Sequence, residues 1–123
     1  MPVGEEDTKQ PEAVSRSAPP AVSGVMSLGT EGHVAMIDPV AADFLGVMPG
    51  TARGLTLEEI LTPGVEREAL TQAIRAPLTA REPEVTRELP FRGRRLRVTS
   101  RRHPLSSGRL ALSVILADIS GQH

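Results

Sequence analysis

A short apolar run that leads straight into a capped helix, within residues 29–47, constrains the fold more than any other feature of the chain. The stretch reads GTEGHVAMIDPVAADFLGV and opens with a glycine-containing turn. Asp38 can accept hydrogen bonds from the free amides that begin a helix, and Pro39 suits the first helical position, where its missing N–H needs no partner. The sequence therefore predicts a strand that ends before Asp38 and a helix that begins after it.

The residues around this corner predict a hairpin followed by three helices. Two apolar runs, at 24–28 and 33–37, flank the turn and are typical of paired strands. The stretch 39–47 predicts a short helix that a glycine ends, and the capping-box spacing of Thr and Glu in 56–61 predicts a second one. An apolar stripe at helical spacing predicts the longest helix, over 65–76.

From residue 85 onward the hydrophobic period changes to two, which predicts three more strands at 85–91, 94–102 and 110–118. In the second of them, Leu96 and Val98 alternate with arginines, as in a sheet with one solvated face. The last strand, LALSVILAD, is apolar on both faces. We therefore expect it at the centre of the sheet, or covered on its second face.

Composition and charge indicate how the chain is organised. It has 123 residues, 39% of them hydrophobic, and a net charge of −1, which suits one soluble domain with a modest core. Residues 1–23 are rich in Pro, Ser, Ala and charge without periodicity, so we expect a flexible N-terminal tail, a folded domain at 24–120 and a C-terminal tail at 121–123. The first residues lack a signal-peptide core and no apolar run is long enough to span a membrane, so we expect a cytoplasmic protein that does not bind membranes.

The order of two strands, three helices and three strands resembles the PAS domain family. The opening stretch looks like that of the family at positions Gly32, Asp38, Ala41, Ala42, Leu45 and Gly46. Asp38 stands where the family more often has Asn, which caps a helix in the same way. The end, Asp118-Ile119-Ser120, resembles the Asp-Ile-Thr that closes the family's last strand. The resemblance implies an α+β fold of order ββαααβββ, with a five-stranded antiparallel sheet and the helices packed on one face.

The resemblance also implies sensing or dimerisation on behalf of a kinase, a cyclase or a transcription regulator, as in bacterial two-component systems. The chain has no cysteine, which excludes a flavin adduct and a thioester-linked chromophore, and the longest predicted helix has no histidine to bind haem. His33, His103 and His123 lie too far apart in the sequence to show metal-ligand spacing. We therefore expect no cofactor and no metal.

A ligand of such a domain would lie between the sheet and the longest helix. The residues expected to line this space are apolar and offer few polar groups to orient a ligand. They are Met36, Phe44, Leu45, Ile60, Leu61, Leu70, Ile74, Leu96, Val98, Leu112 and Val114. We expect a filled core there rather than a ligand cavity, although the methionines Met26, Met36 and Met48 could adapt to an irregular one.

An arginine-rich surface is the first candidate for binding a partner. Seven arginines lie between residues 92 and 109, and Arg95, Arg97 and Arg101 share one face of a predicted strand, where they could contact nucleic-acid phosphates. Aromatic residues for base stacking are missing from this region. We therefore favour a solvated face balanced by Glu84 and Glu88, and do not expect nucleic acid as the partner.

An apolar sheet surface is the second candidate. The positions of the first and last strands expected to point away from the helices are Val25 or Met26, with Ala111, Ser113, Ile115 and Ala117. An apolar patch without cover would bind a second copy or a partner protein. If the strand phase is shifted by one residue, Leu112 and Val114 take the outward positions instead.

The sequence contains no enzyme signature. It has no G-x-S-x-G motif, no phosphate-binding loop ending in Lys and no H-E-x-x-H motif. We predict a non-enzymatic signalling module that forms a homodimer or binds a partner signalling protein. The alternative is a sensor that binds a small apolar ligand, and an arginine-rich nucleic-acid surface is the third interpretation.

Overall fold

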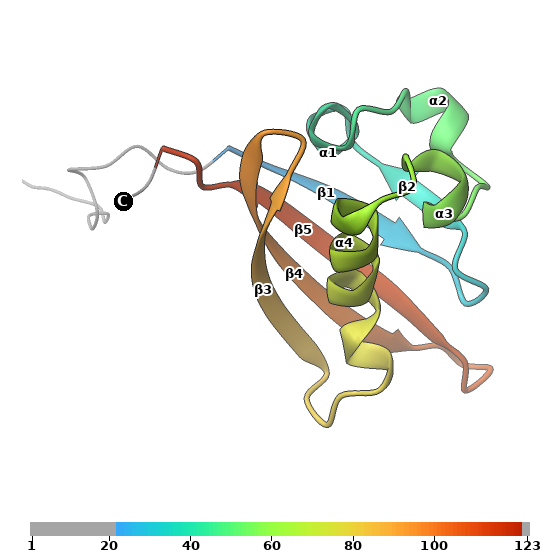
Figure 1. Cartoon of the computed structure of the whole chain (residues 1–123). Helices are drawn as coiled ribbons and strands as arrows, with labels where there is room; N and C mark the ends of the chain where they lie inside the picture. Colours follow the sequence, from blue (N-terminus) through green and yellow to red (C-terminus); the bar gives the residue numbers. More distant parts are fainter. Residues whose placement is uncertain (1–21, 122–123) are drawn as a thin grey trace, which may run out of the picture.

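A computed structural model of the chain describes residues 22–121, in which a layer of helices covers one face of a single sheet (Figure 1). The strands are β1 Val22–Leu28, β2 Val34–Ile37, β3 Glu84–Phe91, β4 Arg94–Pro104 and β5 Leu110–Asp118. The helices are α1 Pro39–Leu45, α2 Pro49–Ala52, α3 Leu57–Ile60 and α4 Val65–Arg75, followed by a 3-10 turn, η1, at Ala76–Leu78. Within the described residues, no helix has the length and apolar character needed to cross a membrane.

The strands lie in the order β2-β1-β5-β4-β3, and every neighbouring pair is antiparallel. β5 is the central strand, and its second apolar face lies on the side of the sheet that the helices leave uncovered. In Figure 1, α4 runs across the face formed by β3 and β4, while α1 packs against β1. The predicted α+β fold, with its helices on one face of a five-stranded antiparallel sheet, is confirmed.

The structure differs from the predicted element boundaries at β1, in an added helix, and at β4, which continues to Pro104. β1 starts at Val22, two residues before the predicted domain start, because Val22 and Ser23 pair with Asp118 and Ala117 of β5. An additional short helix, α2, follows α1 and begins with a proline at its first turn. The rest of the predicted N-terminal tail, residues 1–21, and residues 122–123 of the predicted C-terminal tail lie outside the described residues.

The corner between β2 and α1 forms as the sequence indicates, and it also attaches β1. One carboxylate oxygen of Asp38 accepts a hydrogen bond from the Ala41 amide at 2.8 Å, which caps α1. The other oxygen accepts from the Val25 amide of β1 at 3.0 Å. Gly46 ends the helix with a left-handed φ of 72°, and its amide donates to carbonyls of the last turn. A single carboxylate therefore fixes the helix start against the neighbouring strand.

Gly24 allows α1 to approach the backbone of β1 closely. A Cβ at this position would lie 2.7 Å from Oδ1 of Asp38 and would overlap the Ala41 amide. Since the Ala41 amide is backbone and the Asp38 carboxylate is held by two backbone amides, any larger residue would push α1 away from the strand. This constraint is invisible in the local sequence, where Gly24 only marks the start of an apolar run.

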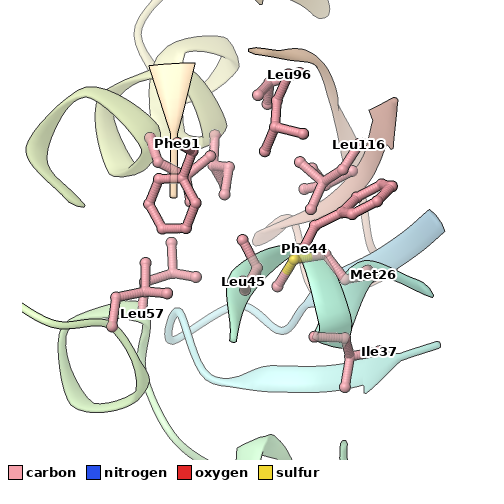
Figure 2. Packing of buried hydrophobic residues seen from close by; sticks show 14 of the residues in the cluster. Met26, Ile37, Phe44, Leu45, Leu57, Phe91, Leu96 and Leu116 are labelled. Atoms are coloured by element: carbon pink, nitrogen blue, oxygen red, sulfur yellow. The ribbon is translucent and has the colours of Figure 1, made fainter. Parts of the chain in front are cut away.

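The core lies between the inner face of the sheet and the helices, as Figure 2 shows for eight labelled side chains. Strands contribute Met26, Leu96 and Leu116, each at most 1% exposed, and α1 contributes Phe44. Burying one such side chain stabilises the fold by roughly 1.5–3 kcal/mol. The helical layer is therefore held to the sheet mainly by apolar packing.

Two polar residues of β4 add specific attachments to this packing. Ser100 is fully buried and its hydroxyl donates to the Ile74 carbonyl of α4 at 2.6 Å. The guanidinium of Arg102 donates to four backbone carbonyls of the segment after α4, those of Pro77, Ala80, Arg81 and Glu82. The end of α4 and the connection to β3 are thus bonded to the sheet through two side chains.

Candidate functional site

The sheet face opposite the helices carries the apolar surface predicted for β1 and β5. Val25 is 39% exposed and Ile115 is 47% exposed, and the two residues are cross-strand partners. Ser113 is also exposed, while Ala111 and Ala117 are half-buried on the same strand. The strand phase favoured from the sequence is the one observed, since Leu112 and Val114 are buried on the helix side.

Two of the predicted positions lie elsewhere. Of the two alternatives for the outer face, Val25 is correct and Met26 is not: Met26 is 1% exposed because successive residues of a strand point to opposite faces. Met36 was assigned to the ligand pocket, but it is 44% exposed and pairs with Ser27 on the outer face. The register of β1 and β2 skips Ala35, a bulge residue that shifts the alternation of β2 and turns Met36 outward.

We define the outer sheet patch as the apolar residues Val25, Met36, Ala111, Ile115 and Ala117 on the uncovered face of β2, β1 and β5. Next to it, Thr99 of β4 pairs with Ile115 and shares a 3.1 Å hydroxyl contact with Thr86 of β3. The apolar side chains of the patch are therefore followed, across the middle of the sheet face, by two threonines.

The predicted basic surface lies on the same face, along β4, where its three arginines share two carboxylates of β3. Arg97 contacts Glu88 at 3.2 Å, Arg101 contacts Glu84 at 3.6 Å, and Arg95 reaches Glu88 at 3.9 Å. Each arginine thus has a carboxylate of β3 within ion-pair distance. The arginines are therefore solvent-exposed and paired with Glu84 and Glu88, the two carboxylates expected beside them from the sequence.

The predicted ligand-pocket residues, apart from Met36, lie in or against the core. Phe44, Leu45, Leu61, Leu70, Ile74, Leu96, Val98, Leu112 and Val114 are all at most 4% exposed, and Ile60 is half-buried against them. They pack against one another in one continuous cluster. The sheet–helix interface therefore has the character of a filled core, as favoured from the sequence.

Surface clefts at the edges of the helical layer include three of the predicted pocket residues: Leu45 and Ile60 line one cleft, and Leu112 lines another. One, of about 360 Å³, lies between the end of α1, the start of α4 and the turn that joins β3 to β4. Clefts of about 690 and 320 Å³ meet at the end of α4, where both are lined by Arg75 and Leu78. None of these three clefts is lined by Leu70, Ile74 or Leu96 of the core.

The end of β5 is held by a polar network around Asp118. Its carboxylate accepts hydrogen bonds from the Ser120 amide at 2.9 Å and from Arg94 at 2.7 Å. The bonds from Ser120, together with Arg94, lower the pKa of Asp118 to about 2. Arg94 also contacts Asp43 of α1 at 3.3 Å and lies over the Phe44 ring. The network therefore connects α1 to the C-terminal end of the sheet.

A second ion pair joins α3 to α4. Both nitrogens at the tip of Arg75 donate to the Glu58 carboxylate, at 2.5 and 2.7 Å. These hydrogen bonds lower the pKa of Glu58 to about 2. Within residues 22–121, His, Asp and Glu side chains form no group of three able to hold a metal ion.

Comparison with known proteins supports the fold through structure rather than sequence. No protein-family model and no curated protein sequence matches the chain. A domain of an HTR-like protein from Haloarcula marismortui superposes with a TM-score of 0.62 at 21% identity, covering 79% of this chain and 97% of that one. The PAS domain of the quorum-sensing receptor RpfR from Cronobacter turicensis, in complex with BDSF, gives a TM-score of 0.52 at 16% identity, covering 82% and 97%.

The chain has a PAS-like fold. A further neighbour is the sensor region of a sensor histidine kinase, with a TM-score of 0.61 at 18% identity; the match covers 90% of this chain and 44% of that region. At these identities the likeness concerns the fold. The PAS-like chain therefore corresponds to about half of that longer sensor region.

Several residues that matter in this PAS-like domain had no functional assignment from the sequence. Arg92 lines the 360 Å³ cleft and has a positive φ of 52° in the turn between β3 and β4. Part of the signal was present, since a two-residue connection between paired strands favours a type I′ turn, in which both residues have positive φ. The individual roles of Arg94 and Arg102 within the arginine-rich stretch were not predicted. Each of these two side chains bonds to residues that lie about twenty or more positions away in the sequence.

Proposed function

We propose that this PAS-like domain is a non-catalytic signalling module that pairs with a second copy through the outer sheet patch. The observation that carries the proposal is the position of this patch: Val25 and Ile115 are exposed at the middle of the sheet on its uncovered face. Exposed apolar residues gathered on one surface favour protein association. The likeness to the sensor region of a histidine kinase supports a role in signal transduction.

The charges around the patch suit a self-complementary contact. Arg97 with Glu88, and Arg101 with Glu84, form rows of opposite sign beside the apolar centre. In a twofold-symmetric dimer the same patch meets itself, so the arginines of one copy can face the carboxylates of the other. A partner protein would need to match both the apolar centre and this rim, whereas a second copy carries both on the same surface.

The proposal is tested by sedimentation velocity over a range of protein concentrations. Ile115→Arg places a charge at the centre of the patch, and we expect a monomer with an unchanged circular dichroism spectrum. The matched control is Leu105→Arg in the β4–β5 connection, because Leu105 is 46% exposed and Ile115 is 47% exposed. The control should remain dimeric. A dimer in the Ile115→Arg variant would exclude this face as the interface.

A further inference from the structure

The cleft between α1, α4 and the β3–β4 turn combines an apolar floor with a cationic rim. Its apolar side is formed by Leu45 and Phe91, which are 2% and 4% exposed, and by the half-buried Ile60. The loop 62–64 and the first turn of α4 form another side. Its volume of about 360 Å³ lies at the small end of the range for ligand pockets, so it suits a small molecule.

Arg92 supplies a positive charge that the fold holds at this cleft. Its amide donates to Glu66 of α4 at 2.8 Å, which fixes the turn against the helix. Its guanidinium lies directly over Gly46, where a Cβ would overlap it. Within residues 22–121 this guanidinium has no carboxylate within ion-pair distance, in contrast to Arg94, Arg95 and Arg97. A charge held in this way is available to an anion in the cleft.

Arg67 adds a second positive charge to the lining of the cleft. One terminal nitrogen of its guanidinium donates to the Glu58 carbonyl at 3.3 Å, and another lies 3.6 Å from the Glu68 carboxylate. Its Nε is buried and has no hydrogen-bond partner among the described residues. Because protein atoms cover this Nε, a ligand in the cleft does not reach it, and the contribution of Arg67 to the lining is its positive charge. Arg67 and Arg92 both line this cleft.

We propose that this cleft binds a small monocarboxylate with an apolar tail. The carboxylate pairs with Arg92, since a planar guanidinium matches a carboxylate in geometry, and the positive charge of Arg67 adds to the attraction. The tail lies against Leu45, Ile60 and Phe91. Glu66 at the rim disfavours a dianion such as phosphate. The site lies on the helical side of the sheet, so it is separate from the outer sheet patch and stands independently of dimerisation.

The test is a titration of the ¹⁵N-labelled full chain with sodium hexanoate, followed by amide chemical shifts. We expect saturable shifts confined to residues around the cleft, such as Gly46, Gly64 and Arg92. Hexan-1-ol, which lacks the charge, and inorganic phosphate, which lacks the tail, should each bind at least about tenfold more weakly. Absence of saturable shifts with hexanoate, or equal binding of hexan-1-ol, would overturn the proposal.

Arg92→Asn removes the positive charge and keeps the turn, because Asn adopts positive φ more readily than Arg and is preferred before glycine in such turns. We expect hexanoate to bind about tenfold more weakly or worse. The matched control is Arg87→Asn, which removes an exposed arginine of β3 that does not line this cleft. The control should bind hexanoate as the unchanged chain does. Unchanged binding by Arg92→Asn would show that the guanidinium does not recognise the carboxylate.

Discussion

Replacing Asp38 tests the corner that joins β1, β2 and α1. Asp38→Ala removes the cap of the Ala41 amide and the bond to the Val25 amide. Loss of a helix N-cap costs about 1 kcal/mol. The bond to Val25 is solvent-exposed, so we assign it a value near the low end for hydrogen bonds, also about 1 kcal/mol. We therefore expect a loss of about 2 kcal/mol in the free energy of unfolding, out of a total of roughly 5–15 kcal/mol.

Asp38→Asn separates the stability lost with the helix cap from the stability lost with the bond to Val25. Asn keeps one acceptor oxygen, which can cap α1, but replaces the second with an NH₂ group that cannot accept from Val25. We expect Asn to lose about 1 kcal/mol, half of the loss for Ala. The control is Asp43→Ala, whose 72% exposed carboxylate makes a single ion pair at 3.3 Å, and its effect should stay below about 0.5 kcal/mol.

The assay is urea unfolding of the four proteins at pH 7 and one fixed protein concentration. The slope of the free energy of unfolding against urea concentration is compared between variants. The expected order of stability is unchanged chain, then Asp38→Asn, then Asp38→Ala. Equal stability of Asp38→Asn and the unchanged chain would refute the contribution of the bond to β1. Equal effects of Asp38→Ala and Asp43→Ala would refute the role of the corner altogether.

Three further predictions concern stability. Gly24→Ala should destabilise the fold by more than 1 kcal/mol in urea unfolding, because its Cβ overlaps the start of α1; a neutral effect would contradict the close approach. Ser100→Ala should cost about 1–2 kcal/mol, because the Ile74 carbonyl loses its buried donor, and an unchanged midpoint would oppose this. Glu58→Gln should be less stable than the unchanged chain above pH 4.5. Since the folded pKa of Glu58 is lowered by Arg75, this difference should disappear as the pH falls toward 2, and a pH-independent difference would rule out the ion pair.

The elements of this fold were predictable because their signals are local. Asp38 and Pro39 mark the start of α1 and Gly46 marks its end, whatever the chain does elsewhere. The alternation in β4 places Leu96 inward, and the apolar character of both faces of β5 predicts its central position. The family resemblance then supplied the layer arrangement that these local signals leave open.

The candidate sites were less predictable because they depend on pairing between distant segments. A single extra residue, Ala35, turned Met36 from the core to the outer face, and periodicity in a four-residue strand cannot reveal such a bulge. The cleft brings Leu45, Phe91 and Arg92 together from α1 and the β3–β4 hairpin. Nothing in the neighbourhood of each residue in sequence indicates that they share a cavity.

Native mass spectrometry of the gently purified chain at low micromolar concentration tests whether the chain forms a dimer, because one spectrum reports the number of copies in the assembly. We expect a dimer for the unchanged chain and a monomer for Ile115→Arg. A monomer for the unchanged chain at every concentration, or a dimer that persists in Ile115→Arg, would contradict self-association through the outer sheet patch.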